Sequence, residues 1–239
     1  MDQKVVGGIF VALVCFGFFY FVINQDTNIS QVEVNTLEEK TDLYEIHAEF
    51  PTFSQADRDF NEKIKKTVLD SIESFKLNLV AQDNIKSAST SEAPFTYASS
   101  WTPDQVNKKV ISFVQNTSFY TGGAHGSREL YTFTYDIEKE KEIFLEDVFK
   151  GASRYLDRIS QYAVNDLQSQ LATQAGVEPN IEMIRSGTSP VQKNYSKFTL
   201  NPNGMITFYF DEYQVAPFAA GEQKIVMPIS FILTQKNND

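Results

Sequence analysis

The chain has 239 residues, of which 42% are hydrophobic and 22% charged, and its formal net charge is −10. This composition supports one sizeable core or two small ones and excludes a chain that is disordered throughout. The acidic balance argues against binding to nucleic acid or to anionic lipid, and it favours either a cationic partner or plain solubility.

The first expected element is an apolar segment near the N-terminus. Val5–Ile23 holds 19 residues without a charge, enough for a helix to cross a bilayer. With Lys4 before it and Asp26 after it, the positive-inside rule predicts a cytoplasmic stub at residues 1–4, a transmembrane signal anchor at 5–23 and an extracytoplasmic remainder. A cleaved signal peptide fits less well because no small-residue cleavage site follows. A lipoprotein fits less well because the apolar run continues past Cys15.

The next two stretches differ in pattern. Residues 24–42 are polar and charged, which predicts a stalk between the membrane and the folded part. Leu43–Phe50 then alternates apolar and polar residues, which predicts a half-buried strand. His47 falls on its polar face between Glu45 and Glu49, where a solvated histidine is favoured over a metal ligand.

A single apolar stripe predicts the first main helix. Its members recur at steps of three or four residues: Phe60, Ile64, Val68, Ile72, Phe75 and Leu79. Ser54 with Asp57 three residues later resembles a capping box at the start, and the continuous stripe is expected to pack on a sheet. After a connector at 81–93, Phe95–Trp101 predicts a strand that ends at a turn over Thr102–Asp104.

The stretch from Asn107 to Ile137 predicts a β-hairpin. Large apolar residues share one parity in each arm, namely Ile111, Phe113 and Phe119, and then Tyr131, Phe133, Tyr135 and Ile137. Three glycines and no proline lie between the arms, so the backbone can take positive φ and reverse direction. The tip of this hairpin contains Gly122, Gly123 and His125.

The second half again places a helix before strands. The helix begins near Ser153 and aligns Tyr155, Ile159, Tyr162, Ala163, Leu167 and Leu171 on one face. We expect a long loop over 174–197, a hairpin over Phe198–Phe210 that turns at Asn203–Gly204, a loop over 211–221 and a closing strand over 225–233.

Together these elements predict an α+β fold: an antiparallel β-sheet with two main helices packed on it, preceded by one N-terminal transmembrane helix. The folded module is expected over residues 43–235, with subregions 43–137 and 138–235.

Motifs for catalysis or cofactor binding are not found. A zinc site would need both His47 and His125 at long range, because the single cysteine lies in the apolar segment. No nucleophile elbow, phosphate-binding loop or dinucleotide fingerprint is present. We therefore predict no catalytic residue, no metal and no cofactor. The 31 acidic residues still leave carboxylate-based glycan cleavage open as an alternative.

Tyr120–Gly126, which reads Tyr-Thr-Gly-Gly-Ala-His-Gly, resembles the hallmark of a bacterial extracytoplasmic domain of unknown function. That domain forms the outer, lysozyme-binding part of the anti-sigma factor RsiV, and a similar module is the N-terminal part of the peptidoglycan deacetylase PdaC. Phe208–Tyr213 and Ala216–Gly221 agree with it, and the resemblance covers about residues 34–233.

The resemblance implies binding rather than catalysis, to a wall-associated, lysozyme-like protein or to peptidoglycan. Its more specific parts place the binding residues on two loops: Tyr120, Gly122, Gly123, His125, Tyr213 and Phe218. Only four residues precede the apolar segment, and no metal-dependent catalytic domain is recognised. We therefore expect a membrane-anchored extracytoplasmic binding module of the cell envelope. The alternatives are an enzyme that acts on wall glycan and a structural envelope protein.

Overall fold

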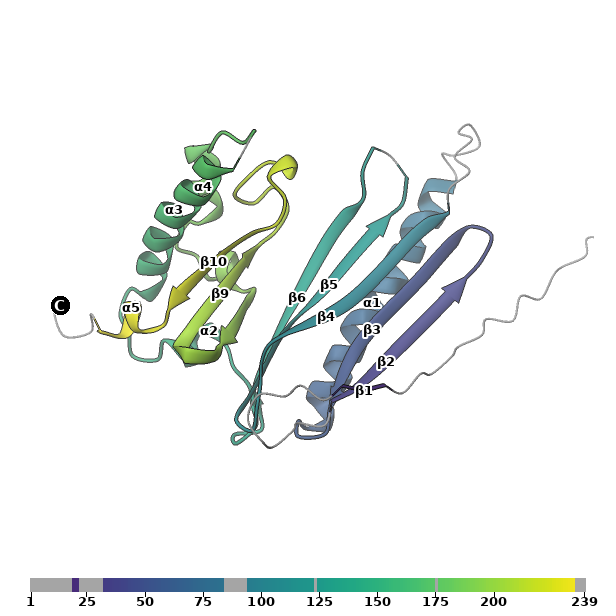
Figure 1. The fold of residues 1–239 in the computed structure, drawn as a ribbon, viewed down its shortest axis with the longest axis horizontal. Coiled ribbons are helices and arrows are strands. Elements are labelled where there is room, and N and C mark those ends of the chain that lie inside the picture. Colours follow the sequence, from purple (N-terminus) through teal and green to yellow (C-terminus); the bar gives the residue numbers. More distant parts are fainter. Residues whose placement is uncertain (1–18, 22–31, 84–93, 123, 175, 235–239) are drawn as a thin grey trace, which may run out of the picture.

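The computed structural model describes residues 19–21, 32–83, 94–122, 124–174 and 176–234, and within them the chain forms two lobes (Figure 1). The N-terminal lobe contains β1 (Phe19–Phe21), β2 (Val32–Lys40), β3 (Tyr44–Phe53), α1 (Arg58–Asp83), β4 (Phe95–Val106), β5 (Val110–Tyr120), β6 (Ser127–Asp136) and β7 (Lys141–Glu142). The C-terminal lobe contains α2 (Leu145–Val148), α3 (Tyr155–Thr173), α4 (Ile181–Gly187), β8 (Phe198–Asn201), β9 (Met205–Phe210), β10 (Gln223–Pro228) and α5 (Ser230–Leu233). Three short 3₁₀ turns complete it: η1 (Gln192–Tyr195), η2 (Pro202–Gly204) and η3 (Phe218–Ala220).

Each lobe has one sheet, one long helix and its own core. The sheet of the N-terminal lobe has seven described strands in chain order, and α1 covers one of its faces. The predicted apolar stripe of α1 packs there against alternate residues of the strands, such as Ile111 and Phe113 of β5. In the C-terminal lobe α3 lies on the three-stranded sheet β8–β10, with Ile159, Leu167 and Ile206 in a second cluster. The α+β class and the two main helices are therefore confirmed, but the strands form two sheets rather than one.

The prediction of an all-antiparallel sheet is wrong at one pair. β3 and β4 are parallel, because α1 carries the chain back to the end of the sheet where β3 began. β4 is also longer than predicted and runs through the expected turn at Thr102–Asp104. Its pairing with β5 shifts between Pro103 and Gln105, which fits a residue that lacks a backbone N–H.

The predicted stalk over residues 24–42 is wrong in its second half. Val32–Lys40 form β2, which pairs with β3 along its whole length, and Val32 and Val34 are buried. The Nζ atom of Lys76 on α1 lies 2.5 Å from the Oε2 atom of Glu39 and ties the strand to the helix. The polar composition of this stretch reflects the solvent-facing residues of a strand near the sheet edge. The folded lobe therefore begins before residue 43.

No helix among the described residues is long and apolar enough to cross a membrane. Most of the predicted anchor, residues 5–18 and 22–23, lies outside the described residues. The three residues of it that are described, Phe19–Phe21, pair with Val32–Val34 as the short strand β1, so a helix is not found there.

Local chemistry adjusts several predicted boundaries. Asp57 rather than Ser54 caps α1, since its Oδ1 atom accepts a hydrogen bond from the backbone N–H of Phe60 at 2.7 Å. The predicted loop over 174–197 contains α4, capped by Asn180, and the turn η1. The predicted closing strand over 225–233 ends at Pro228, after which the chain turns into α5. The predicted Asn203–Gly204 turn is present, with positive φ at both residues.

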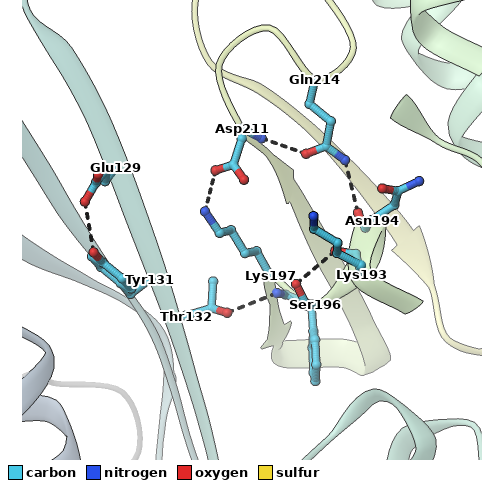
Figure 2. Close-up of polar contacts among 10 residues, drawn as sticks. Glu129, Tyr131, Thr132, Lys193, Asn194, Ser196, Lys197, Asp211 and Gln214 are labelled. Carbon is cyan, nitrogen blue, oxygen red and sulfur yellow. Dashed lines mark hydrogen bonds and ion pairs between the residues drawn. The ribbon is translucent and has the colours of Figure 1, made fainter. Parts of the chain in front are cut away.

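The two lobes meet where the edge strand β8 lies across the face of the large sheet that α1 leaves uncovered. The backbone N–H of Phe198 donates to the Oγ1 atom of Thr132 at 3.1 Å (Figure 2). The N–H of Leu200 donates to the Oγ atom of Ser112 at 2.8 Å. Val114 and Leu130 pack with Tyr209 in a small core between the lobes. These contacts fix the C-terminal lobe on the sheet and leave a hollow beside it.

Candidate binding cleft

A cleft of about 500 Å³ lies between the uncovered face of the large sheet and the segment from Phe210 to Glu222. Strand parity explains most of its floor, because residues one step away from the α1-facing positions point into it, as Ala98, Ser100, Asn116 and Ser118 do. From the sheet it is lined by His47, Ala98, Ser99, Ser100, Asn116, Thr117, Ser118, Arg128, Glu129 and Leu130, and from the other lobe by Phe210, Asp211, Glu212, Phe218, Ala219, Gly221 and Glu222. The floor is thus made of small and hydrogen-bonding groups.

Three aromatic rings stand in a row, and the middle one, Phe218, lines the cleft. The imidazole of His125, on the tip between β5 and β6, stacks on Phe218 with ring centroids 4.0 Å apart and planes 23° from parallel. Phe218 in turn faces Tyr213 at 6.1 Å with planes at 28°. The row joins the hairpin of one lobe to the loop of the other, so two separate sequence motifs meet in one surface.

The backbone of Tyr213 supports a functional role for this row. Its φ is +63°, a conformation that non-glycine residues rarely adopt, and such strain gathers at binding and catalytic sites. The residue is 55% exposed, so burial does not account for the conformation.

The loop over 211–221 is held by hydrogen bonds to the rest of its lobe (Figure 2). The Oε1 atom of Gln214 accepts from the N–H of Asp211 at 2.9 Å, and its Nε2 atom donates to the carbonyl oxygen of Gly187 at 2.9 Å. Lys197 forms an ion pair with the carboxylate of Asp211. Two residues of the loop itself, Val215 and Ala216, are buried. The Phe218 ring is therefore presented from a fixed support.

The cleft is also lined from β3 by His47, which lies opposite Ala98 of β4. Its Nδ1 atom is 3.3 Å from the Oε1 atom of Glu38, and its Nε2 atom is 3.7 Å from the Oε1 atom of Glu49. All three side chains are about half exposed. This group places hydrogen-bonding capacity at the β3 side of the floor.

The charged groups of the lining are mostly acidic, with Arg128 as the single lysine or arginine among the lining residues. Two of the four carboxylates are already engaged. Asp211 pairs with Lys197, and Glu129 accepts a hydrogen bond of 2.9 Å from the hydroxyl of Tyr131. Burial and this carboxylate together raise the pKa of Tyr131 to about 12. Glu212 and Glu222 remain as the carboxylates most open to a ligand.

The structure unites three of the six predicted site residues, His125, Tyr213 and Phe218, at one surface. Gly122 has φ of +98°, as the turn prediction required, and Gly123 lies outside the described residues. Tyr120 ends β5 and does not line the cleft.

Sequence reasoning missed Arg128, Glu212 and Glu222, and it read His47 only as a solvated residue. The signal for His47 was its place on the polar face of a strand. That face is covered only by a lobe encoded much later in the chain. Within the described residues, no group of three or more histidine, cysteine, aspartate or glutamate side chains could hold a metal ion.

Comparisons with known proteins divide along the same two lobes. Residues 37–128 match the family model described as deacetylase PdaC, and residues 146–230 match that of a protein of unknown function, DUF3298. The peptidoglycan-N-acetylmuramic acid deacetylase PdaC of Bacillus subtilis is 26% identical over 238 residues, which is 94% of this chain and 49% of that protein. The chain thus spans about half the length of this relative. The predicted resemblance to the PdaC module and to a domain of unknown function is confirmed.

One further protein is similar in sequence, and two solved structures are similar in fold. The immunogenic protein MPT64 of Mycobacterium tuberculosis is 29% identical over 168 residues, covering 65% of this chain and 68% of that protein. A solved member of the DUF3298 family from Bacteroides fragilis superposes with a TM-score of 0.58 at 17% identity, covering 89% of this chain and 94% of the other. A DUF3298 protein from Pseudomonas aeruginosa gives 0.54 at 12% identity, with coverages of 86% and 94%. At these identities the two structures show the fold alone.

Proposed function

We propose that this chain is an extracytoplasmic module of the bacterial envelope, anchored by residues 5–23, that binds wall glycan in the cleft between its lobes. The observation that carries the proposal is the row of His125, Phe218 and Tyr213 beside a floor that includes the side chains of Ser100, Asn116 and Ser118. Sugars present apolar ring faces and hydroxyl edges. A site that binds them combines aromatic surface with a few fixed polar groups.

The comparisons support the envelope setting of this proposal. The relative from Bacillus subtilis is a peptidoglycan deacetylase by name, and the match to the family model described as deacetylase PdaC includes the sheet floor of the cleft. The C-terminal lobe, with its match to a family of unknown function, supplies Phe218 and Tyr213. Glycan recognition in the cleft thus uses residues of both matched regions.

Binding can be separated from catalysis and from adventitious adsorption by sedimentation with insoluble peptidoglycan. We expect the purified whole chain to sediment with the wall material and the Phe218→Ala variant to stay largely in the supernatant. Phe231→Ala is the matched control, since Phe231 is also a partly exposed ring, packed on Tyr162 at 5.2 Å, but does not line the cleft. Equal sedimentation of both variants would overturn the proposal, and release of sugar fragments would identify an enzyme instead.

A second candidate ligand is a basic, lysozyme-like protein, and the net charge of −10 favours it. Opposite charges accelerate association at low ionic strength. The exposed His125 and Tyr213 sit on loops of different lobes, where a protein partner can reach both. A titration with basic lysozyme at two salt concentrations tests this candidate. Binding that Phe218→Ala weakens supports it, and absence of binding at both concentrations removes it.

A further inference from the structure

We propose that the cleft prefers glycan whose amino sugars carry free ammonium groups over glycan that is fully N-acetylated. This inference rests on the proposed glycan-binding function and names the chemical class of the ligand. It follows from the balance of charge around the cleft and from the position of two carboxylates beside the aromatic row.

The carboxylates in question flank the aromatic residues in the chain. Glu212 directly precedes Tyr213, and Glu222 follows the turn η3 that contains Phe218. Both line the same cleft as the Phe218 ring. A sugar that contacts Phe218 in the cleft therefore places its ring substituents near carboxylates of the same loop.

Of the four carboxylates that line the cleft, these two have the weakest interactions with other groups of the protein. Glu212 makes no hydrogen bond or ion pair with any residue in the described part of the chain. Glu222 has its nearest cation, the Nζ atom of Lys224, 4.0 Å from its Oε1 atom, and both side chains are substantially exposed. Exposed pairs of this kind contribute little energy, so Glu222 keeps most of its capacity for a ligand.

The two nitrogen substituents, ammonium and acetamido, interact differently with these carboxylates. An ammonium group gains a charge-assisted hydrogen bond to a carboxylate, which is stronger than a bond between neutral groups. An acetamido group is neutral and lacks this gain. Arg128 acts in the opposite sense, because its cation lies in the lining and repels an ammonium group. The proposal therefore predicts that removing a carboxylate weakens the preference for ammonium and that removing the Arg128 cation strengthens it.

The test compares two chemically defined probes, the β-1,4-linked tetramer of glucosamine and that of N-acetylglucosamine. Calorimetric titration of the whole chain is carried out at a pH where the amines are protonated. We expect the glucosamine tetramer to bind roughly tenfold more tightly, the ratio that one charge-assisted hydrogen bond supplies. Glu212→Gln and Glu222→Gln should each reduce this ratio, Arg128→Gln should increase it, and Phe218→Ala should weaken both tetramers alike.

A control variant excludes attraction by net charge alone. Glu62→Gln on the exposed face of α1 changes the net charge by the same amount away from the cleft, and it should leave the ratio unchanged. Equal affinity of the parent for both tetramers would overturn the ammonium preference and leave the glycan-binding function standing. A fall in the ratio for Glu62→Gln as large as for Glu212→Gln would also overturn it. Failure of the parent to bind either tetramer would count against both proposals.

Discussion

The imidazole of His125 and the ring of Phe218 lie in parallel contact, with centroids 4.0 Å apart, although they belong to different lobes. The hairpin tip of the large sheet therefore touches the loop that carries Phe218. A second set of contacts, where β8 meets Ser112 and Thr132, fixes the lobes elsewhere on the same sheet face. The cleft lies on that face, so its shape depends on both sets of contacts.

The stacked pair should show a measurable coupling energy. Stacked aromatic pairs contribute about 0.5–1.5 kcal/mol beyond the area they bury. We expect a double-mutant cycle of His125→Ala and Phe218→Ala, followed by chemical denaturation, to give a coupling in this range. The same cycle with Phe231→Ala in place of Phe218→Ala should give none. Independent, additive effects for His125 and Phe218 would show that the contact is absent in solution.

Gly187 should be intolerant of any side chain. A Cβ atom added there would lie 2.0 Å from the carbonyl oxygen of Gln214, on the loop that carries Phe218. Gly187→Ala should therefore displace this loop, lower the free energy of unfolding by about 2 kcal/mol or more and weaken glycan binding. Ser186→Ala, at the exposed neighbouring position, is the control and should melt like the parent. A parental melting temperature for Gly187→Ala would contradict the packing of α4 on the loop.

The bond between β2 and α1 predicts a dependence of stability on pH. Partial burial tends to raise the pKa of Glu39, but the hydrogen bonds from Lys76 and Tyr44 outweigh it and hold the pKa below its usual value. A lowered pKa stabilises the fold above the unfolded-state pKa of about 4.3, and this contribution is lost as pH falls through the folded pKa. We expect Glu39→Gln to reduce the loss of unfolding free energy on acidification by at most about 1 kcal/mol.

The control for that measurement is Glu73→Gln, an exposed carboxylate on the helix that carries Lys76. It should leave this loss unchanged. If both variants show the same dependence of unfolding free energy on pH as the parent between about pH 5 and pH 3, the ion pair of Glu39 does not contribute to stability. The attachment of β2 to α1 would then rest on apolar packing, with Val32 buried and Leu37 partly buried in the cluster that includes the α1 stripe.

Removal of a hydroxyl from the lobe interface should loosen the C-terminal lobe. Ser112 is fully buried, accepts from the N–H of Leu200 at 2.8 Å and lies 2.9 Å from the hydroxyl of Thr134. Ser112→Ala leaves these buried groups without that partner, at a cost of about 1–3 kcal/mol. We expect faster amide hydrogen exchange at Leu200. Ser118→Ala, exposed on the same strand, should not alter it, and unchanged exchange in Ser112→Ala would exclude the docking geometry.

Regular periodicity explains which parts of the fold could be predicted from the sequence. The stripe from Phe60 to Leu79 and the alternation in Val110–Tyr120 each repeat often enough to specify an element and its buried face. β2 offered no such pattern, because apart from Val32, Val34 and Leu37 its residues are polar, as in a linker. The parallel pairing of β3 and β4 depends on where α1 returns the chain, which local sequence does not encode.

The candidate site divides in the same way. His125, Tyr213 and Phe218 could be selected because they stand in short, distinctive motifs. Their contact could not be deduced, since it depends on the docking of β8 through the hydroxyls of Ser112 and Thr132. Arg128 and Glu222 look like ordinary surface charges in sequence and become part of a cleft only when the lobes meet.

The location of the binding surface is the central claim, and it is tested most directly by nuclear magnetic resonance. The ¹⁵N-labelled whole chain is titrated with soluble, peptide-free peptidoglycan glycan strands, and amide shifts are followed residue by residue. We predict saturable shifts confined to the floor and the aromatic row, with Ala98, Ser118, His125 and Phe218 among the largest. Shifts centred instead on the exposed face of α1, at Leu69 and Leu77, or no shift at saturating glycan, would contradict the account.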